Sequence, residues 1–267
     1  INGSMKYLIN ELKAAGKTRV ALYGVNTSSI SDIGRVDGLF AFKDESFNKM
    51  RIFTNNGSLK NCFDEFFKKC ASFDAVICSN DFAAVSLIRN LLKIAPDELN
   101  RLKILSCAQT KLSGYYKNML TSVNMNFEQY GKAAVFIYEK LKAHPYMSGI
   151  TVTVKWTGEN EKTPQHKTVT VNNSESGYEF YADGDMRNML TAEQILNTCS
   201  DSDRLIIMSL ISGMTIEETA GHCFLTEGGV KYRIKRILNE CKLSDKSELL
   251  TLLKDYLNPI IPKTPEL

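Results

Sequence analysis

Short apolar runs alternate with longer amphipathic stretches from Met5 to about Lys142. The runs have the length of buried strands, and the stretches have the length and the spacing of apolar positions typical of helices. They predict strands at 19–23, 51–53, 75–78 and 102–105. They predict helices at 5–15, 35–43, 59–70, 82–92 and 127–141, the first of which ends at Gly16. This order predicts βαβ units and a parallel sheet covered on both faces.

The pattern changes after Leu141. Thr151–Val154 and Thr168–Val171 alternate polar and apolar residues, as half-buried antiparallel strands do, and a polar stretch separates them. They predict a hairpin with a long tip.

The last third of the chain has the spacing of apolar residues that is typical of helices. A segment rich in Asn, Ser and Gly precedes it, at 172–177. Within it we predict helices at 203–211, 215–222, 226–241 and 246–256. The sequence therefore predicts an α/β region at 1–171, a linker at 172–189 and an all-α domain at 190–258.

Composition narrows the class of protein only slightly. The chain has 267 residues, which suits two domains, and a formal net charge of +3, which favours no partner. Its seven cysteines form no C-x-x-C pair, so we expect reduced, packed thiols and not disulfides or a zinc site. No apolar run spans a bilayer and no signal-peptide pattern occurs, so we expect a cytoplasmic protein without a membrane partner.

The predicted helix 226–241 carries concentrated positive charge. Thr215 with Glu218 has the spacing of a capping box, and Thr226 is the expected N-cap of the next helix after a short turn. Two helices joined in this way match a DNA-binding helix-turn-helix. Four cations lie away from the apolar face of the second helix: Lys231, Arg233, Lys235 and Arg236. They can reach base edges or phosphates, although an ordinary solvated helix face remains an alternative.

The segments 203–213, 215–220 and 230–235 resemble the LuxR-type helix-turn-helix. The resemblance implies that Gly213 closes the first helix, that Glu218 and Ala220 belong to the scaffold helix, and that Val230 and Lys231 lie on the recognition helix. Gly228 and Gly229 depart from the family, which usually has a polar or cationic residue there. The apolar stripe of the last helix serves either dimerisation or the core of the domain.

Polar residues follow the predicted strands of the α/β region. Ligands of open α/β sheets bind outside the carboxyl ends of the strands. These ends carry Asn26, Thr27, Asn80, Asp81, Ala108 and Gln109, and Arg35 follows the first of these loops. Arg35 and Asp81 equally suit structural roles, as a helix anchor and a helix cap.

Five segments of this region, 12–24, 34–38, 73–81, 120–123 and Gly131, resemble the periplasmic-binding-protein-like sensor of the lactose-repressor family. The resemblance implies an effector cleft lined by Arg35 and by Asn80 or Asp81. Sugar-binding members tend to carry Asp where this chain has Ala108 or Gln109, so a sugar is not implied. The family pattern places further βα units before Met5, and we therefore expect an incomplete N-terminal lobe.

Other classes of function lack their sequence signals. The three histidines are dispersed, and the chain has no G-x-S-x-G, no P-loop and no dinucleotide fingerprint. We expect no catalysis, no cofactor and no metal. A receiver domain would carry acidic residues after its first strand, and 23–27 carries none.

These observations predict a bacterial transcription regulator that binds double-stranded DNA and a small-molecule effector as a homodimer. The expected DNA-binding residues are Thr226, Lys231, Arg233, Lys235 and Arg236. The expected effector-binding residues are Asn26, Arg35, Asn80, Asp81 and Gln109. The alternative is a ligand-binding or scaffold protein whose helical domain recruits a protein partner.

Overall fold

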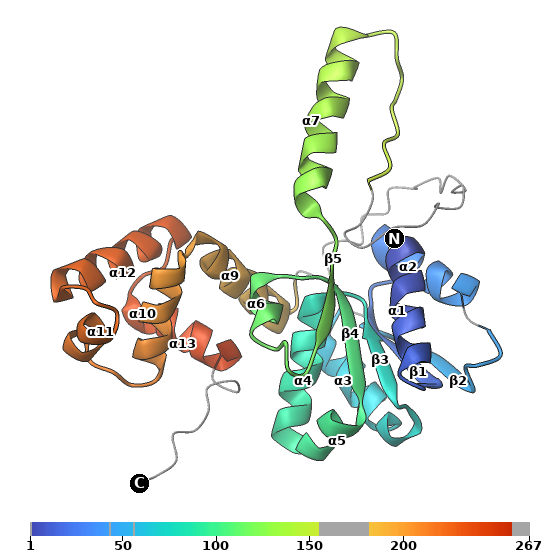
Figure 1. The fold of residues 1–267 in the computed structure, drawn as a ribbon, viewed down its shortest axis with the longest axis horizontal. Coiled ribbons are helices and arrows are strands. Elements are labelled where there is room, and N and C mark those ends of the chain that lie inside the picture. The colour runs from blue at the N-terminus through green and yellow to red at the C-terminus, as the bar shows by residue number, and fades with distance from the viewer. Residues whose placement is uncertain (1, 43, 56, 155–181, 258–267) are drawn as a thin grey trace.

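The computed structural model describes residues 2–42, 44–55, 57–154 and 182–257. Its first part is one five-stranded parallel sheet in the order β2-β1-β3-β4-β5, with helices packed against it (Figure 1). Within residues 182–257 every regular element is a helix. The predicted fold class, a parallel α/β region followed by an all-α region, is confirmed.

The strands are β1 Arg19–Val25, β2 Lys49–Thr54, β3 Ala75–Cys78, β4 Lys103–Ala108 and β5 Thr121–Asn124. The helices of the first part are α1 Asn2–Ala14, α2 Ile30–Phe42, α3 Leu59–Phe67, α4 Asp81–Ile94, α5 Pro96–Arg101, α6 Lys111–Gly114 and α7 Phe127–Ala143, with a 3₁₀ turn at Cys70–Ser72. The later helices are α9 Gly184–Thr198, α10 Asp201–Ile211, α11 Ile216–His222, α12 Glu227–Cys241 and α13 Lys246–Leu257.

Successive residues of β1 face opposite sides of the sheet, and both sides are buried. Val20 and Leu22 belong to the core beneath α1 and α2. Ala21 and Tyr23 belong to the larger core beneath α3 and α4. Burial on both faces explains why the strand reads as a continuous apolar run in the sequence.

Two helices and one strand of the α/β part were not predicted. α5 and α6 are short, and β5 is an edge strand in which only Val123 is buried. Short helices and edge strands carry little hydrophobic signal, because few of their side chains must be apolar. The predicted turn at Gly16 is confirmed by its φ of 65°.

The predicted hairpin is corrected in its first strand. Residues 151–154 have no strand structure, and most of their side chains are exposed. Their alternating pattern therefore packs against no sheet in this structure. The second predicted strand, 168–171, lies outside the described residues, as do residues 172–181 of the predicted linker. The rest of that predicted linker, from residue 184 to 189, belongs to helix α9.

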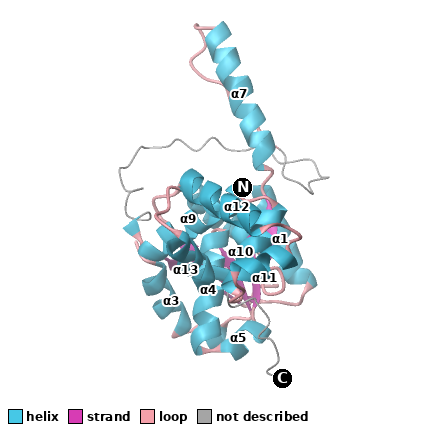
Figure 2. Cartoon of the chain, turned by 90° about the vertical axis from the view of Figure 1, so that its left-hand side faces the viewer, coloured by secondary structure: helices cyan, strands magenta, loops and turns pink. Residues whose placement is uncertain are grey.

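The helical part shares a core with the α/β part. Met189, Ile195 and Leu253 are fully buried in the same cluster as Leu87 of α4 and Tyr116 after α6. α9 packs against both α4 and α13, and in Figure 2 the helical part lies in front of the α/β part. In the described ranges no helix is both long enough and apolar enough to cross a membrane.

Candidate functional site

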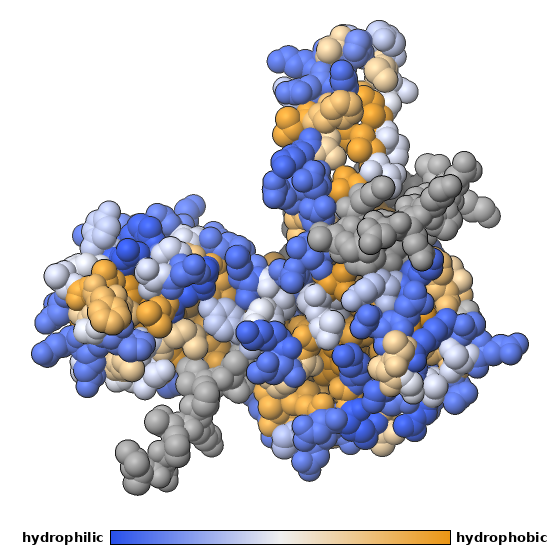
Figure 3. Space-filling model, viewed as in Figure 1, coloured by the Kyte–Doolittle hydropathy of each residue, from blue (hydrophilic) through white to orange (hydrophobic). Residues whose placement is uncertain are grey.

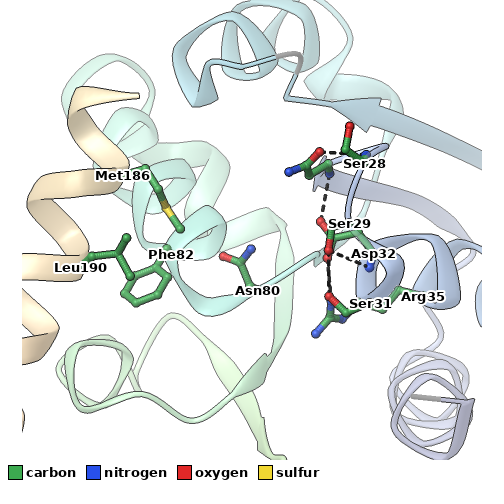
Figure 4. A pocket seen from close by; sticks show the side chains of 10 residues that line it. Ser28, Ser29, Ser31, Asp32, Arg35, Asn80, Phe82, Met186 and Leu190 are labelled. Atoms are coloured by element: carbon green, nitrogen blue, oxygen red, sulfur yellow. Dashed lines mark hydrogen bonds and ion pairs between the residues drawn. The ribbon is translucent and has the colours of Figure 1, made fainter. Parts of the chain in front are cut away.

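A pocket of about 360 Å³ lies where the strand order reverses, at the carboxyl ends of β1 and β3. Three elements surround it: the loop from β1 into α2, the start of α4, and α9. Gly24 lets α4 approach β1 closely, since a Cβ there would lie 2.7 Å from the Cβ of Ala83. The pocket is lined by Asn26, Ser28, Ser29, Ser31, Asp32, Arg35, Asn80, Phe82, Met186 and Leu190 (Figure 4).

One wall of the pocket is polar and comes from the β1–α2 loop and the first turns of α2. The Asn26 side-chain oxygen accepts a hydrogen bond of 2.9 Å from the backbone N–H of Ser28. The hydroxyls of Ser29 and Ser31 lie 2.9 Å apart. This wall offers hydroxyl and amide groups to a ligand.

A buried ion pair anchors the polar wall. Arg35 Nη1 lies 2.6 Å from Asp32 Oδ1, and the backbone N–H of Asn26 donates to Asp32 Oδ2 at 2.9 Å. Burial raises the pKa of the Asp32 carboxyl, and the contacts with Asn26 and Arg35 only partly oppose it. Asp32 and Arg35 are the charged residues of the lining, and their charges cancel. The pocket therefore suits neutral hydrogen-bonding groups better than an ion.

The opposite wall is apolar. Phe82 at the start of α4 faces Met186 and Leu190 of α9, and Asn80 stands between the two walls (Figure 4). Asn80 is also the N-cap of α4, because its side-chain oxygen accepts from the N–H of Ala83 at 2.9 Å. A ligand with one polar and one apolar end matches these walls.

Asp81 and Gln109, which the sequence placed with the effector residues, do not line this pocket. The Asp81 carboxylate is fully buried and accepts hydrogen bonds from Ser106 Oγ at 2.5 Å and Ser122 Oγ at 2.6 Å. It also accepts from the N–H of Thr110 at 2.7 Å. Asp81 thereby joins α4 to β4 and β5, while Asn26, Arg35 and Asn80 lie at the pocket.

Sequence reasoning missed the three serines, Asp32 and the apolar wall. The serines carried a signal, since Ser28 and Ser29 lie in the short loop after β1 and Ser31 lies in the first turn of α2. Met186 and Leu190 carried none, because they come from a helix more than a hundred residues away from the rest of the lining in the sequence.

Side chains cap the N-termini of α10, α11 and α12 in the helical part. Ser200 with Asp203 and Thr215 with Glu218 form capping boxes, and Thr226 accepts from the N–H of Gly229 at 3.1 Å. The predicted caps at Thr215 and Thr226 are confirmed. α11 and α12 thus form two short, well-defined helices joined by a turn.

Two of the four predicted cations point back into the helical part. Asp203 is fully buried, and its carboxylate lies 3.0 Å from Arg233 Nη1 and 2.5 Å from Arg236 Nη2. Burial raises the pKa of Asp203, but the bonds from Ser200 and the two arginines outweigh it, so its pKa lies below the ordinary value. These ion pairs fix α12 against the start of α10.

The outer face of α12 is exposed. Lys231 pairs with Glu227 of the same helix at 3.0 Å. Among the described residues, Lys235 forms no ion pair. Tyr232 beside them is 71% exposed, and Phe224 in the preceding turn is 96% exposed. This face presents two lysines and aromatic surface to a partner.

The apolar stripe of α13 lies inside the chain. Leu249, Leu253 and Tyr256 are buried in the shared core, and Leu250 is partly buried. Of the two roles left open by the sequence, the core role is the one these side chains have here.

α9 connects the pocket to the helical part through polar contacts as well as apolar ones. Asp185 lies 2.9 Å from Arg89 of α4 and accepts from Tyr256 Oη of α13 at 2.8 Å. Glu193 accepts from the backbone N–H groups of Lys111 and Leu112 at 2.9 and 2.7 Å. One helix thus contacts the pocket, the start of α6 and α13.

No protein-family model matches the chain, and no curated protein shows significant similarity to it. Solved structures do match. An uncharacterized protein from Actinobacillus succinogenes is 20% identical with a TM-score of 0.49, over 58% of this chain and 59% of that one. The Lac repressor bound to ONPG is 17% identical with a TM-score of 0.46, over 54% and 45%. The trehalose repressor from Escherichia coli is 17% identical with a TM-score of 0.43, over 54% and 56%. The chain covers less than two thirds of the length of each of these proteins.

Proposed function

We propose that the protein is a DNA-binding transcription regulator whose α/β part binds a small-molecule effector. The observation that carries the proposal is the exposed outer face of α12, which follows α11 after a short turn and begins at a side-chain cap. A helix held in this way fits the major groove. The resemblance of 203–235 to the LuxR-type helix-turn-helix supports the same function.

In this proposal Lys231 and Lys235 contact DNA directly, and Thr226 orients the start of α12. Arg233 and Arg236 act mainly by holding α12 through Asp203. Lysines on an exposed helix contact phosphates, which position the protein without selecting a sequence. Sequence selectivity must then come from other groups on the same face.

The effector site of this proposal is the pocket between the β1–α2 loop and α9. Effector binding would change the position of α9, because Met186 and Leu190 form one wall. The same helix packs in one core with α13. Ligand and DNA affinities are then reciprocally linked, and a compound that alters DNA affinity must bind more or less tightly when DNA is present.

A homodimer belongs to the proposal because one helix-turn-helix covers only a half-site. The α13 stripe is engaged within the chain, so a dimer would use another surface.

The first test is enrichment from a pool of random duplex DNA at two salt concentrations. Wild-type protein should retain selected sequences, and salt should weaken the binding. The double variant Lys231→Ala with Lys235→Ala should lower the salt dependence by about two ion contacts. The matched control is Lys140→Ala with Lys142→Ala, which removes two exposed lysines of α7 and should change nothing.

A specific observation favours a second candidate function, recruitment of a protein partner by the helical part. Three of the four α12 cations are in ion pairs, and Phe224 and Tyr232 expose aromatic surface. Failure of folded wild-type protein to retain any DNA at low salt would contradict the regulator and favour this candidate.

A further inference from the structure

The outer face of α12 presents no arginine at its N-terminal half. Arg233 and Arg236 both contact the buried carboxylate of Asp203, on the side of the helix that faces α10. Arginine is the commonest reader of guanine in the major groove, where it donates to two acceptors of one base. If α12 enters the groove, it must recognise bases by other means.

Gly228 lies on this face, in the first turn of α12. Nothing in the surrounding structure requires a glycine at this position. A Cβ built there meets nothing closer than Thr226 Oγ1 at 3.9 Å, and its φ is not in the left-handed region. Glycine also lowers helix stability relative to alanine. Gly229 differs, because its Cβ would lie 3.3 Å from the capping oxygen of Thr226. The missing side chain at Gly228 therefore leaves space for a partner and serves no contact within the chain.

Tyr232 stands one helical turn after Gly228 on the same face. Its side chain is 71% exposed, and Lys231 and Lys235 flank it. The ring offers apolar surface, and lysines that can contact phosphates lie next to it in the sequence and one turn later. An apolar side chain in the major groove recognises the C5-methyl group, which only thymine carries there among the four bases.

We propose that Gly228 and Tyr232 form the base-reading surface of α12, with Gly228 allowing close approach of the helix and Tyr232 contacting thymine methyl groups. This inference rests on the proposed DNA-binding function. It assigns specificity to a glycine and a tyrosine, and positioning to the lysines.

The test uses the duplex enriched by wild-type protein and the same duplex made with deoxyuridine in place of thymidine. Deoxyuridine keeps the base pairing and removes only the methyl groups. Wild-type protein should bind the uridine duplex about three- to fivefold more weakly for each contacted methyl. Tyr232→Ala should bind both duplexes equally. Tyr138→Ala, a control that removes a similarly exposed tyrosine from α7, should keep the wild-type difference.

Gly228→Ala is a second test, because the variant should keep or raise the thermal stability of the protein while it lowers the affinity for DNA. The variant should melt at the same or a higher temperature than wild type, yet bind the enriched duplex about tenfold more weakly. Gly131→Ala adds the same methyl to α7, where nothing lies within 4 Å, and should leave DNA affinity unchanged.

Equal wild-type affinity for the two duplexes, or unchanged discrimination by Tyr232→Ala, would overturn this inference and leave the regulator standing. Absence of any enriched duplex with folded wild-type protein would overturn both.

Discussion

The helices α7 and α9 differ in how much of their surface packs against the rest of the molecule. α9 buries five residues, namely Met186, Met189, Ala192, Ile195 and Leu196. α7 buries none and projects away from the sheet (Figure 1). Its apolar side chains include Phe127 and Tyr138, which are 61% and 66% exposed, and Figure 3 shows apolar surface along the projection.

An amphipathic pattern thus predicts a helix, but it does not predict which other element packs against the apolar side of that helix. The buried side of α9 packs against α4, α6, α12 and α13. Within α7, Glu128 forms an ion pair with Lys132, one turn later in the same helix. Residues of α9 should therefore contribute to global stability, whereas residues of α7 should contribute only to the helix itself.

The largest expected effect is loss of a buried side chain of α9. Ile195→Ala should lower the free energy of unfolding by about 2–5 kcal/mol, because it opens a cavity in the core that the two parts share. Val135→Ala on α7, where the side chain is 58% exposed, should stay within about 0.5 kcal/mol of wild type. Chemical denaturation measures both, and equal losses would contradict the comparison.

The second effect is a loss of stability at alkaline pH. Burial raises the pKa of the Tyr256 phenol above its ordinary value, and the neighbouring Asp185 carboxylate raises it further. The folded state thus holds the proton more tightly than the unfolded state. The stabilisation is complete below about pH 10, the unfolded value, and falls by up to about 1.4 kcal/mol per pH unit above it.

Denaturation series at several pH values check this prediction. Tyr256→Phe should flatten the alkaline decline, while Tyr138→Phe on α7 serves as the matched control. A decline that is identical in wild type and Tyr256→Phe would be evidence against the assignment.

A third, smaller effect concerns the carboxylate of Glu193. Glu193→Ala should cost about 1 kcal/mol, since it removes the acceptor for the N–H groups of Lys111 and Leu112. Glu128→Ala on α7 should cost no more than about 0.5 kcal/mol, because it breaks only an exposed ion pair. The two variants are compared by thermal and chemical unfolding, and a reversed order would place the anchoring role elsewhere.

The smallest expected effect is a local stabilisation of α7. Gly131→Ala should strengthen α7 by about 0.5–1 kcal/mol through helix propensity. Amide exchange within α7 should slow up to about fivefold, with the midpoint of global unfolding unchanged. A clear rise of the global midpoint would show that α7 unfolds together with the core.

The sequence predicted the inner strands because burial on both faces makes them continuous apolar runs. Ala75–Cys78 has the same bounds in the prediction and in the structure. β5 was missed since an edge strand is less buried and alternates. The caps at Thr215 and Thr226 were predictable because capping depends on residues three apart.

The site was predictable only where local sequence determines it. Asn26, Arg35 and Asn80 follow strand ends, so their position at the pocket follows from sheet topology. The wall from α9 depends on the packing of two parts distant in sequence. Arg233 was expected to face outward, but its contact with Asp203 involves a partner thirty residues away.

The shared core also has a consequence for protein engineering. Two parts of a protein can be recombined with those of another chain only where few contacts cross the cut. Here a cut before Gly184 would separate Asp185 from Arg89 and expose the apolar residues of α9 and α13. A working chimera would have to transplant residues 184–257 together with the surface of α4 and α6 on which they rest.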